Sequence, residues 1–181
     1  MKDTRNEIIT IANDLIRSVG YNAFSYADIS KELNIKNAAI HYYFPAKGDL
    51  GVEVIKRNLF AFKEKTDFWK NLDCSQQLMN YITMHDRFID KHFACIVGSL
   101  SPSYDTLPEN MQKELQKLVN TIIGWLSDIL DKGKKAGVFK FDETSLEQAY
   151  VIHSAMLSAL LMNKVLKNDI YKSIQYSLLN I

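Results

Sequence analysis

The chain has 181 residues, of which 47% are hydrophobic and 24% charged, and its formal net charge is +1. Seven glycines and three prolines are few for this length, which argues against an all-β sandwich or barrel with many tight turns. A near-neutral charge excludes bulk basicity as the source of any nucleic-acid binding, so such binding would depend on local charge placement.

The sequence contains no apolar run long enough to span a membrane, and its first residues include Asp3, Glu7 and Asp14 instead of a long apolar block. Two cysteines, Cys74 and Cys95, are too few for a disulfide scaffold or a four-thiolate zinc site. We therefore expect a cytoplasmic protein with no membrane segment, no metal centre and no cofactor.

The first part of the chain has the periodicity of helices. Apolar residues recur through residues 8–19 at the spacing of a helix with one buried face, and Gly20 suits the end of that helix. Ser25 and Asp28 have the spacing of a capping box, which predicts a second helix. This helix is short, because Asn34 favours the left-handed conformation of a tight turn.

A third helix is predicted over residues 37–43, where Pro45 prevents its smooth continuation. Two short helices joined by a turn of about three residues, after a longer helix, have the outline of a helix-turn-helix motif. The next helix is predicted from Lys47 to about Lys65.

Beyond Phe68 the pattern also predicts helices. Ser75 is predicted to cap a helix that extends to His92, and a long helix follows Pro108 and ends at Gly137. The segment between these two helices contains a short apolar stretch and a loop.

Thr144 and Glu147 form a second capping-box pair before a helix that extends to about Lys167, and Asp169 is predicted to cap a last short helix. Residues 138–141 are the only candidate for an extended segment. The sequence therefore predicts an all-α fold of about nine helices.

The segment between Asn34 and Gly48 is locally basic, because it contains lysines and a histidine but no acidic residue. In a helix-turn-helix the second helix enters the major groove with its amino-terminal half against the base edges. The predicted contacts to bases or phosphates are Ser25, Tyr26, Lys36, Asn37, Ala38, Ala39, His41, Tyr42, Tyr43 and Lys47. The spacing alone also allows a solvated turn between core helices.

Residues 39–47, with the sequence AIHYYFPAK, and the following Leu50 resemble the recognition-helix region of the TetR family of bacterial repressors. Three positions depart from the family pattern: Lys36 replaces the usual Ser, Asn34 replaces a frequent Gly, and His41 stands where Tyr is commonest. The departure at His41 concerns base preference more than DNA binding itself.

This resemblance implies an amino-terminal helix-turn-helix domain over residues 1–46 and a domain for effector binding and dimerisation over residues 47–181. The implied protein is a homodimer that binds a pseudo-palindromic operator in double-stranded DNA and leaves it when a small organic effector binds. The helix from Lys47 to Lys65 would then transmit the change.

The resemblance also implies an effector pocket within residues 60–165, where aromatic and methionine side chains are abundant. A mostly apolar cavity with a few polar groups suits an organic ligand. The candidate lining residues are Phe62, Tyr81, Met84, His85, Phe88, His92, Cys95, Trp125 and Met156. Aromatic residues at helical spacing are, however, also typical of an ordinary core.

The segment from Cys95 to Leu100 is similar to that of a TetR subgroup with a Cys-aliphatic-aliphatic-Gly sequence. Some members of this subgroup respond to electrophiles or oxidants through the cysteine, and the resemblance implies a nearby lysine at Lys164. A neighbouring ammonium would stabilise the thiolate. The alternative is a small, buried and inert cysteine.

Two other classes of function stay open. His85, His92 and Cys95 have a spacing that places them on roughly one stripe of a continuous helix, which would allow a metal site or a helical enzyme. A DNA-binding protein that organises the chromosome without an effector, or an activator, would also fit the helix-turn-helix.

The last two predicted helices are apolar around much of their circumference, so they must be buried on more than one side. A second copy of the chain is the available partner, and the resemblance implies a dimer through a four-helix bundle. The predicted interface residues are Leu146, Ala149, His153, Leu157, Leu160, Leu161, Lys164, Ile174 and Leu178.

Overall fold

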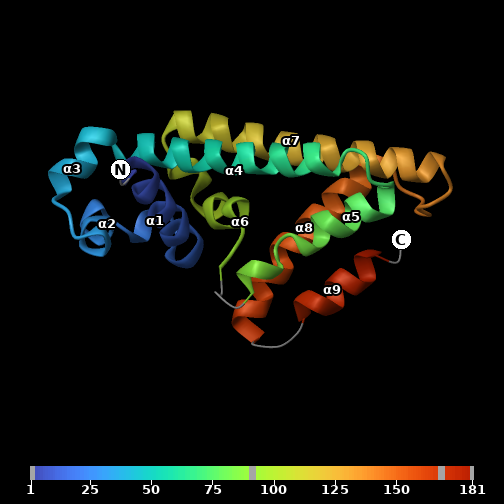
Figure 1. Ribbon diagram of the computed structural model, residues 1–181. Coiled ribbons are helices and arrows are strands. Elements are labelled where there is room, and N and C mark those ends of the chain that lie inside the picture. The colour runs from blue at the N-terminus through green and yellow to red at the C-terminus, as the bar shows by residue number, and fades with distance from the viewer. Residues whose placement is uncertain (1–2, 90–92, 167–169, 180–181) are drawn as a thin grey trace. The chain divides into compact units, whose positions relative to one another are not determined.

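The computed structural model describes residues 3–89, 93–166 and 170–179 of the chain. These residues form nine α-helices and three short 3₁₀ helices, and they include no β-strand (Figure 1). The all-α fold predicted from the sequence is confirmed.

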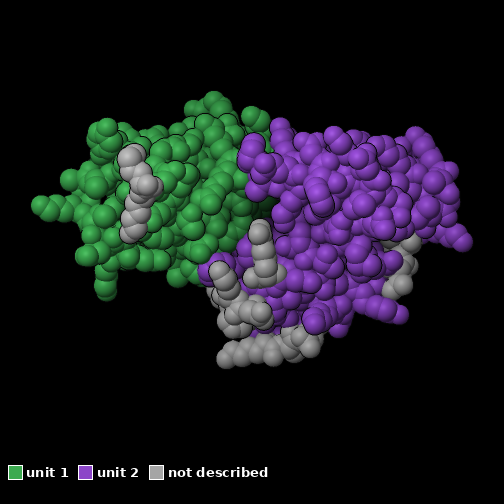
Figure 2. Space-filling model, in the orientation of Figure 1, with its two compact units in different colours: residues 1–59, 96–118 green, residues 60–95, 119–181 purple. Residues whose placement is uncertain are grey.

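The chain divides into two compact units, which Figure 2 shows in different colours. Unit 1 contains residues 1–59 and 96–118, and unit 2 contains residues 60–95 and 119–181. The functional division predicted at residue 46 stays a prediction.

Two long helices each belong in part to both units. Helix α4 (Lys47–Trp69) lies in unit 1 as far as residue 59, and α7 (Glu109–Lys135) lies in unit 1 as far as residue 118. The predicted helix from Lys47 thus continues four residues past Lys65 before it ends at Trp69.

Unit 1 begins with α1 (Thr4–Val19), α2 (Tyr26–Leu33) and α3 (Asn37–Tyr43), and α2 packs against both of the others. The apolar residues of α1 that the structure buries are Ile8, Ile9, Ala12 and Ile16. Helix α1 ends at Gly20, whose φ of +95° lies in the region that favours glycine. A short 3₁₀ helix at Tyr21–Ala23 then leads into α2.

The rest of unit 1 supports these three helices. Helix α6 (Ile96–Leu100) packs against α1 and leads into the 3₁₀ helix Ser101–Thr106. Within unit 1, α4 and α7 approach closely at Gly51, where a Cβ would overlap the side chain of Met111. Glycine at this position therefore permits the close packing of the two helices.

Unit 2 contains α5 (Cys74–Thr83), α8 (Ser145–Leu166) and α9 (Ile170–Leu179), and α9 packs against the other two. The hydroxyl of Tyr171 in α9 donates a hydrogen bond to the carbonyl oxygen of Ile82 at 3.1 Å. The side-chain amide of Gln175 donates to the same carbonyl and to Asp86. These polar contacts attach α9 to the end of α5.

The helix predicted from Ser75 to His92 differs at both ends. Asp73, not Ser75, caps α5 and accepts a hydrogen bond from the backbone of Gln76 at 2.8 Å. Helix α5 ends at Thr83 and is followed by a short 3₁₀ helix at Asp86–Phe88.

The single stripe predicted for His85, His92 and Cys95 therefore does not form, because α5 ends at Thr83 and residues 93–95 are not helical. His92 itself lies outside the described residues. Within the described part of the chain, no group of three or more His, Cys, Asp or Glu side chains could hold a metal ion.

The carboxy-terminal half of the chain follows the predicted helix boundaries more closely. Gly137, with a φ of +72°, follows α7, and residues 138–141 form no strand. The predicted capping box at α8 is confirmed, since Thr144 and Glu147 exchange hydrogen bonds through backbone and side chain. Asp169 lies outside the described residues.

None of the described helices combines the length and the apolar composition that a membrane span requires.

Candidate DNA-binding and effector sites

The turn before α3 is defined by local hydrogen bonds. Asp28 accepts hydrogen bonds from the backbone and the hydroxyl of Ser25 at 2.7 and 2.8 Å, which closes the capping box of α2 and lowers the pKa of Asp28. Asn34 ends α2 in the left-handed conformation with φ 54° and ψ 46°, as the sequence predicts. The chain therefore reverses within three residues, and α3 begins at Asn37.

One side of α3 is anchored in the core of unit 1. Ile40 is fully buried, and Phe44 at the end of the helix is 1% exposed. The hydroxyl of Tyr26 donates a hydrogen bond to the carbonyl oxygen of Phe44 at 2.8 Å, and the ring of Tyr26 contacts that of His41. Burial raises the pKa of Tyr26 to about 12.

Tyr26 therefore positions the end of α3, and its predicted contact with DNA stays a prediction. Its side chain is buried, and its hydroxyl already has a partner in the backbone at the end of α3. The other predicted contacts next to it, Ser25 and His41, are exposed.

The opposite side of α3 faces outward and is rich in aromatic and polar groups. Tyr42 is 82% exposed and Tyr43 is 38% exposed, and their rings contact each other edge to face at 5.2 Å. The remaining predicted contacts on this helix are exposed at Lys36, Asn37 and Ala38 and half-buried at Ala39. Two tyrosine rings with this exposure contribute little to the packing of the core, so they are available to contact a partner.

Lys47 has a different environment from the one predicted. Its ammonium donates hydrogen bonds to the carbonyl oxygens of Tyr21, at 2.6 Å, and Phe24, and lies over both aromatic rings at 4.7 and 4.1 Å. Burial lowers the pKa of Lys47, and the charge of Asp28 acts in the opposite direction. Lys47 thus connects the start of α4 to the segment between α1 and α2, and its charge is used inside unit 1.

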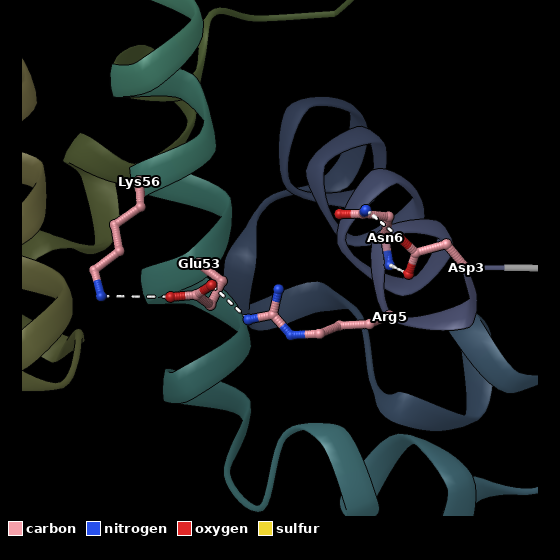
Figure 3. A network of polar contacts seen from close by, with 5 residues as sticks. All are labelled: Asp3, Arg5, Asn6, Glu53 and Lys56. Carbon is pink, nitrogen blue, oxygen red and sulfur yellow. Dashed lines mark hydrogen bonds and ion pairs between the residues drawn. The ribbon is translucent and has the colours of Figure 1, made fainter.

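A second polar network holds the start of α1 against α4 (Figure 3). Arg5 forms an ion pair with Glu53 at 2.5 Å, and Lys56 adds a longer contact to the same carboxylate at 3.4 Å. The hydrogen bond from Arg5 lowers the pKa of Glu53. The guanidinium of Arg5 also lies 5.2 Å from the centre of the Phe44 ring, next to the end of α3. This network was not predicted, because its partners are 48 positions apart.

The predicted pocket residues of unit 2 include a connected aromatic cluster around Trp125. Its ring lies 5.7 Å from Phe62, 5.9 Å from Trp69 and 5.8 Å from Tyr81, measured between ring centres. Tyr81 also contacts His85 at 6.3 Å. The structure thus brings together four predicted pocket residues, Phe62, Tyr81, His85 and Trp125, and adds Trp69.

The other predicted pocket residues vary in exposure. Met156 and Cys95 are buried, while Met84 and Phe88 are half-buried. His92 lies outside the described residues.

A buried polar pair lies at the edge of this aromatic cluster. The hydroxyl of Tyr81 is 2.7 Å from Nδ1 of His153, and both side chains are buried. Burial lowers the pKa of His153 to about 4, so its imidazole is neutral near pH 7, and burial also raises the pKa of Tyr81. The sequence predicted His153 at the dimer interface, whereas its side chain points into unit 2.

Comparison with known proteins agrees with the geometry of unit 1. Residues 8–54 match the model of the bacterial regulatory proteins, tetR family. The chain is 23% identical over 173 residues to the HTH-type transcriptional repressor NemR of Escherichia coli strain K12, covering 90% of this chain and 85% of that protein.

Two solved TetR-family regulators share the complete fold. A TetR transcriptional regulator from Legionella pneumophila has a TM-score of 0.88 at 27% identity, covering 98% of this chain and 96% of that one. A TetR-family regulator from Agrobacterium tumefaciens has a TM-score of 0.90 at 27% identity, covering 97% and 95%. Residues 8–54 are thus a DNA-binding domain of the TetR type, in a chain that has the fold of TetR-family regulators. The chain is accordingly a DNA-binding transcriptional regulator and not an enzyme.

The exposed apolar side chains of α8 include only part of the predicted dimer-interface set. The predicted interface residues that are buried inside the chain are Ala149, His153, Leu160 and Leu178. Leu157 and Ile174 are half-buried, Leu146 and Leu161 are exposed, and the side chain of Lys164 lies outside the described part. The exposed apolar residues that were missed on α8 are Tyr150, Val151, Met162, Val165 and Leu166. A helix that is apolar on all sides gives no periodic signal for which face is outward.

Proposed function

We propose that this TetR-family regulator is a homodimeric repressor that a small organic effector releases from a pseudo-palindromic operator. The observation that carries the proposal is the outward side of α3, where Tyr42 is 82% exposed on a helix anchored by Ile40 and Phe44. A rigidly held helix with exposed aromatic and amide groups suits insertion into the major groove. Because the partner is chromosomal DNA, we also propose a cytoplasmic location.

In the proposed complex the residues of α3 divide into two roles. The amide of Asn37 and the imidazole of His41 have the donors and acceptors needed to read base edges, and Ala38 leaves room for a thymine methyl group. Lys36, exposed at the start of the helix, suits a backbone phosphate. Two such helices in a dimer would contact half-sites about 34–36 Å apart or somewhat farther.

The exposed apolar side of α8 supports a second copy as the dimer partner. Tyr150 and Val151 are each 52% exposed, Met162 is 41% and Val165 is 76% exposed. Such side chains on one helix exceed the isolated apolar residues that an ordinary surface contains. Association of two copies would cover them, and a symmetric dimer would present two α3 helices to a symmetric operator.

Effector release requires a ligand that binds one conformation more tightly than the other. The aromatic cluster of Phe62, Tyr81 and Trp125 supports a site for an organic ligand in unit 2. Helix α4 begins next to α3 and ends in unit 2, so it is the element we propose to transmit the change. Residues 1–46 would bind DNA and residues 47–181 would bind the effector and dimerise.

Thiol sensing through Cys95 is a second version of the effector step. Cys95 belongs to unit 2 and is only 6% exposed. An electrophile would therefore have to enter the interior of unit 2 to reach the sulfur. Loss of an electrophile response in a Cys95→Ser variant would support this version, and a retained response would exclude it.

The test of the proposed function is binding to duplexes that tile the DNA upstream of the protein's own gene. Fluorescence anisotropy should identify a duplex with an inverted repeat that binds two chains, and footprinting should show two protected half-sites. Equal affinity for all duplexes would instead favour a chromosome-organising protein. A thermal-shift screen of small molecules, followed by operator competition, then tests the effector step.

A further inference from the structure

The Tyr81–His153 pair contains an unused hydrogen-bonding atom in the interior of unit 2. Tyr81 is fully buried and His153 is 8% exposed, and the Tyr81 hydroxyl lies 2.7 Å from Nδ1 of His153. The other ring nitrogen, Nε2, is buried, and no described residue gives it a hydrogen-bond partner. Buried polar atoms in native proteins nearly always have a partner, so an unpaired one marks a position where a ligand or a water molecule can bind.

The number of protons on the pair determines what Nε2 can offer. A neutral imidazole has one N–H group, and the tyrosine hydroxyl has one proton. If the hydroxyl donates to Nδ1, the imidazole proton is on Nε2 and one donor is unpaired. If Nδ1 donates to the tyrosine oxygen, both the hydroxyl proton and the Nε2 lone pair lack a partner among the described residues. The first arrangement leaves fewer unpaired groups, so Nε2 is a hydrogen-bond donor.

Aromatic rings next to the pair connect it to the surface of unit 2. The Tyr81 ring contacts Trp125 at 5.8 Å, and Trp125 contacts Phe62 at 5.7 Å. Trp125 also lines a hollow of about 210 Å³ on unit 2, whose other lining residues are Thr66, Asp67, Lys70, Gln77, Asp128, Ile129 and Lys132. The aromatic cluster therefore extends from a surface hollow to the buried pair.

The charge of the ligand follows from the charges that act on the pair. Among the residues that the structure describes, burial is the only cause that shifts the pKa of His153, and no cation contributes to that of Tyr81. A ligand carboxylate at Nε2 would be buried without a positive partner from the described side chains, which is strongly unfavourable. A neutral oxygen acceptor does not carry this cost.

We propose that His153 Nε2–H, oriented by the Tyr81 hydroxyl, binds the effector through a neutral carbonyl oxygen while the aromatic cluster holds the apolar body of the effector. This inference rests on the proposed function, since it names the chemical class of the effector. His153 is the direct contact and Tyr81 is a positioning residue.

The first test is the tautomer of His153 in the unmodified protein. Nitrogen-15 NMR of histidine-labelled protein at about pH 7 should show a neutral His153 with its proton on Nε2. A proton on Nδ1, or a doubly protonated ring, would overturn the proposal. This measurement needs no variant, no DNA and no ligand.

The second test compares two probes of nearly equal shape, the ketone tetralone and the hydrocarbon tetralin, by calorimetry or by Trp fluorescence. The wild-type protein should bind tetralone about fivefold to tenfold more tightly than tetralin. His153→Phe should remove this preference, because it keeps an aromatic ring but lacks the N–H. The control Tyr171→Phe removes another buried hydroxyl, which bonds to Ile82, and should keep the preference.

The proposal is overturned if tetralone does not bind, if both probes bind equally to the wild type, or if the preference survives in His153→Phe. Tighter binding of a tetralin carboxylate than of tetralone would also overturn it. Operator competition separates this inference from the proposed function. A ketone preference without any release from the operator would support the donor site and contradict the effector step of the proposed function.

Discussion

Tyr81 and His153 are 72 positions apart in the chain, yet the Tyr81 hydroxyl lies 2.7 Å from Nδ1 of His153. The contact joins α5 to α8 inside unit 2 and keeps a neutral imidazole in the interior. Local sequence patterns cannot indicate such a pair, because each residue by itself fits an ordinary apolar helix face. The pair nevertheless affects the free energy of unfolding, which can be measured.

The first prediction is a loss of stability in acid that depends on His153. Burial lowers the pKa of His153 from 6.5 to about 4, so between these values the unfolded chain binds more protons than the folded one. Neutral His153 therefore contributes about 3 kcal/mol to the free energy of unfolding above pH 6.5. This contribution is lost as the pH falls from 6.5 to about 4. Urea unfolding at a series of pH values and one protein concentration measures it.

Comparison with two variants isolates this effect from other titrating groups. His153→Phe should flatten the pH profile of the unfolding free energy in this window. His41→Gln, which changes an exposed histidine, should leave the profile as in the wild type. Identical profiles for His153→Phe and the wild type would contradict the assignment.

The second prediction distinguishes two lysines near α3. Lys47 donates to two backbone carbonyls, so Lys47→Ala should lower the unfolding free energy by about 1–2 kcal/mol and leave the salt dependence of operator binding unchanged. Lys36→Ala should keep the stability but reduce the slope of log affinity against log salt by about one, because an exposed phosphate contact is lost. If Lys47→Ala reduced the salt slope and Lys36→Ala did not, the phosphate contact would belong to Lys47.

The third prediction concerns the turn between α2 and α3. Asn34 has a φ of +54°, where a side chain other than Asn or Asp is unfavourable. Asn34→Ala should therefore lower the unfolding free energy by about 1–2 kcal/mol, while Asn34→Gly should change it by less than about 1 kcal/mol. Thermal unfolding of the two variants measures the difference. Equal losses for Ala and Gly would show that the side-chain contacts of Asn34 matter more than its backbone conformation.

The fourth prediction tests the dimer face on α8. Val165→Glu combined with Met162→Glu places two charges in a surface that we expect a second copy to bury, and should convert the dimer into a monomer. Sedimentation velocity measures the change, and circular dichroism verifies that the helices are intact. The matched control is Phe68→Glu, since Phe68 is 84% exposed on α4. A dimer that persists in the double variant would exclude this face.

The sequence predicts best those elements that local interactions determine. The bounds of α3, the left-handed Asn34 and the capping box of Ser25 and Asp28 depend on residues within a few positions of each other. The resemblance in residues 39–47 then identified the helix-turn-helix motif. The match of residues 8–54 to the tetR family of bacterial regulatory proteins confirms it.

The structure adds to or alters the sequence-based expectations where contacts join distant elements. Tyr26 and Lys47 have polar groups that suit DNA, but both groups are used by backbone carbonyls inside unit 1. His153 lies on a helix that is apolar on all sides, so periodicity could not indicate its direction. The end of α5 at Thr83 separates His85 from the histidine and cysteine with which a longer helix would have aligned it.

The central claim, that α3 reads base edges, is tested most directly by the affinity of wild type and Asn37→Ala for operator duplexes that each differ at one base pair. The account predicts that Asn37→Ala loses about 1–3 kcal/mol of discrimination at one position in each half-site and keeps it elsewhere. A uniform loss of affinity across all duplexes, with discrimination unchanged at every position, would contradict the claim.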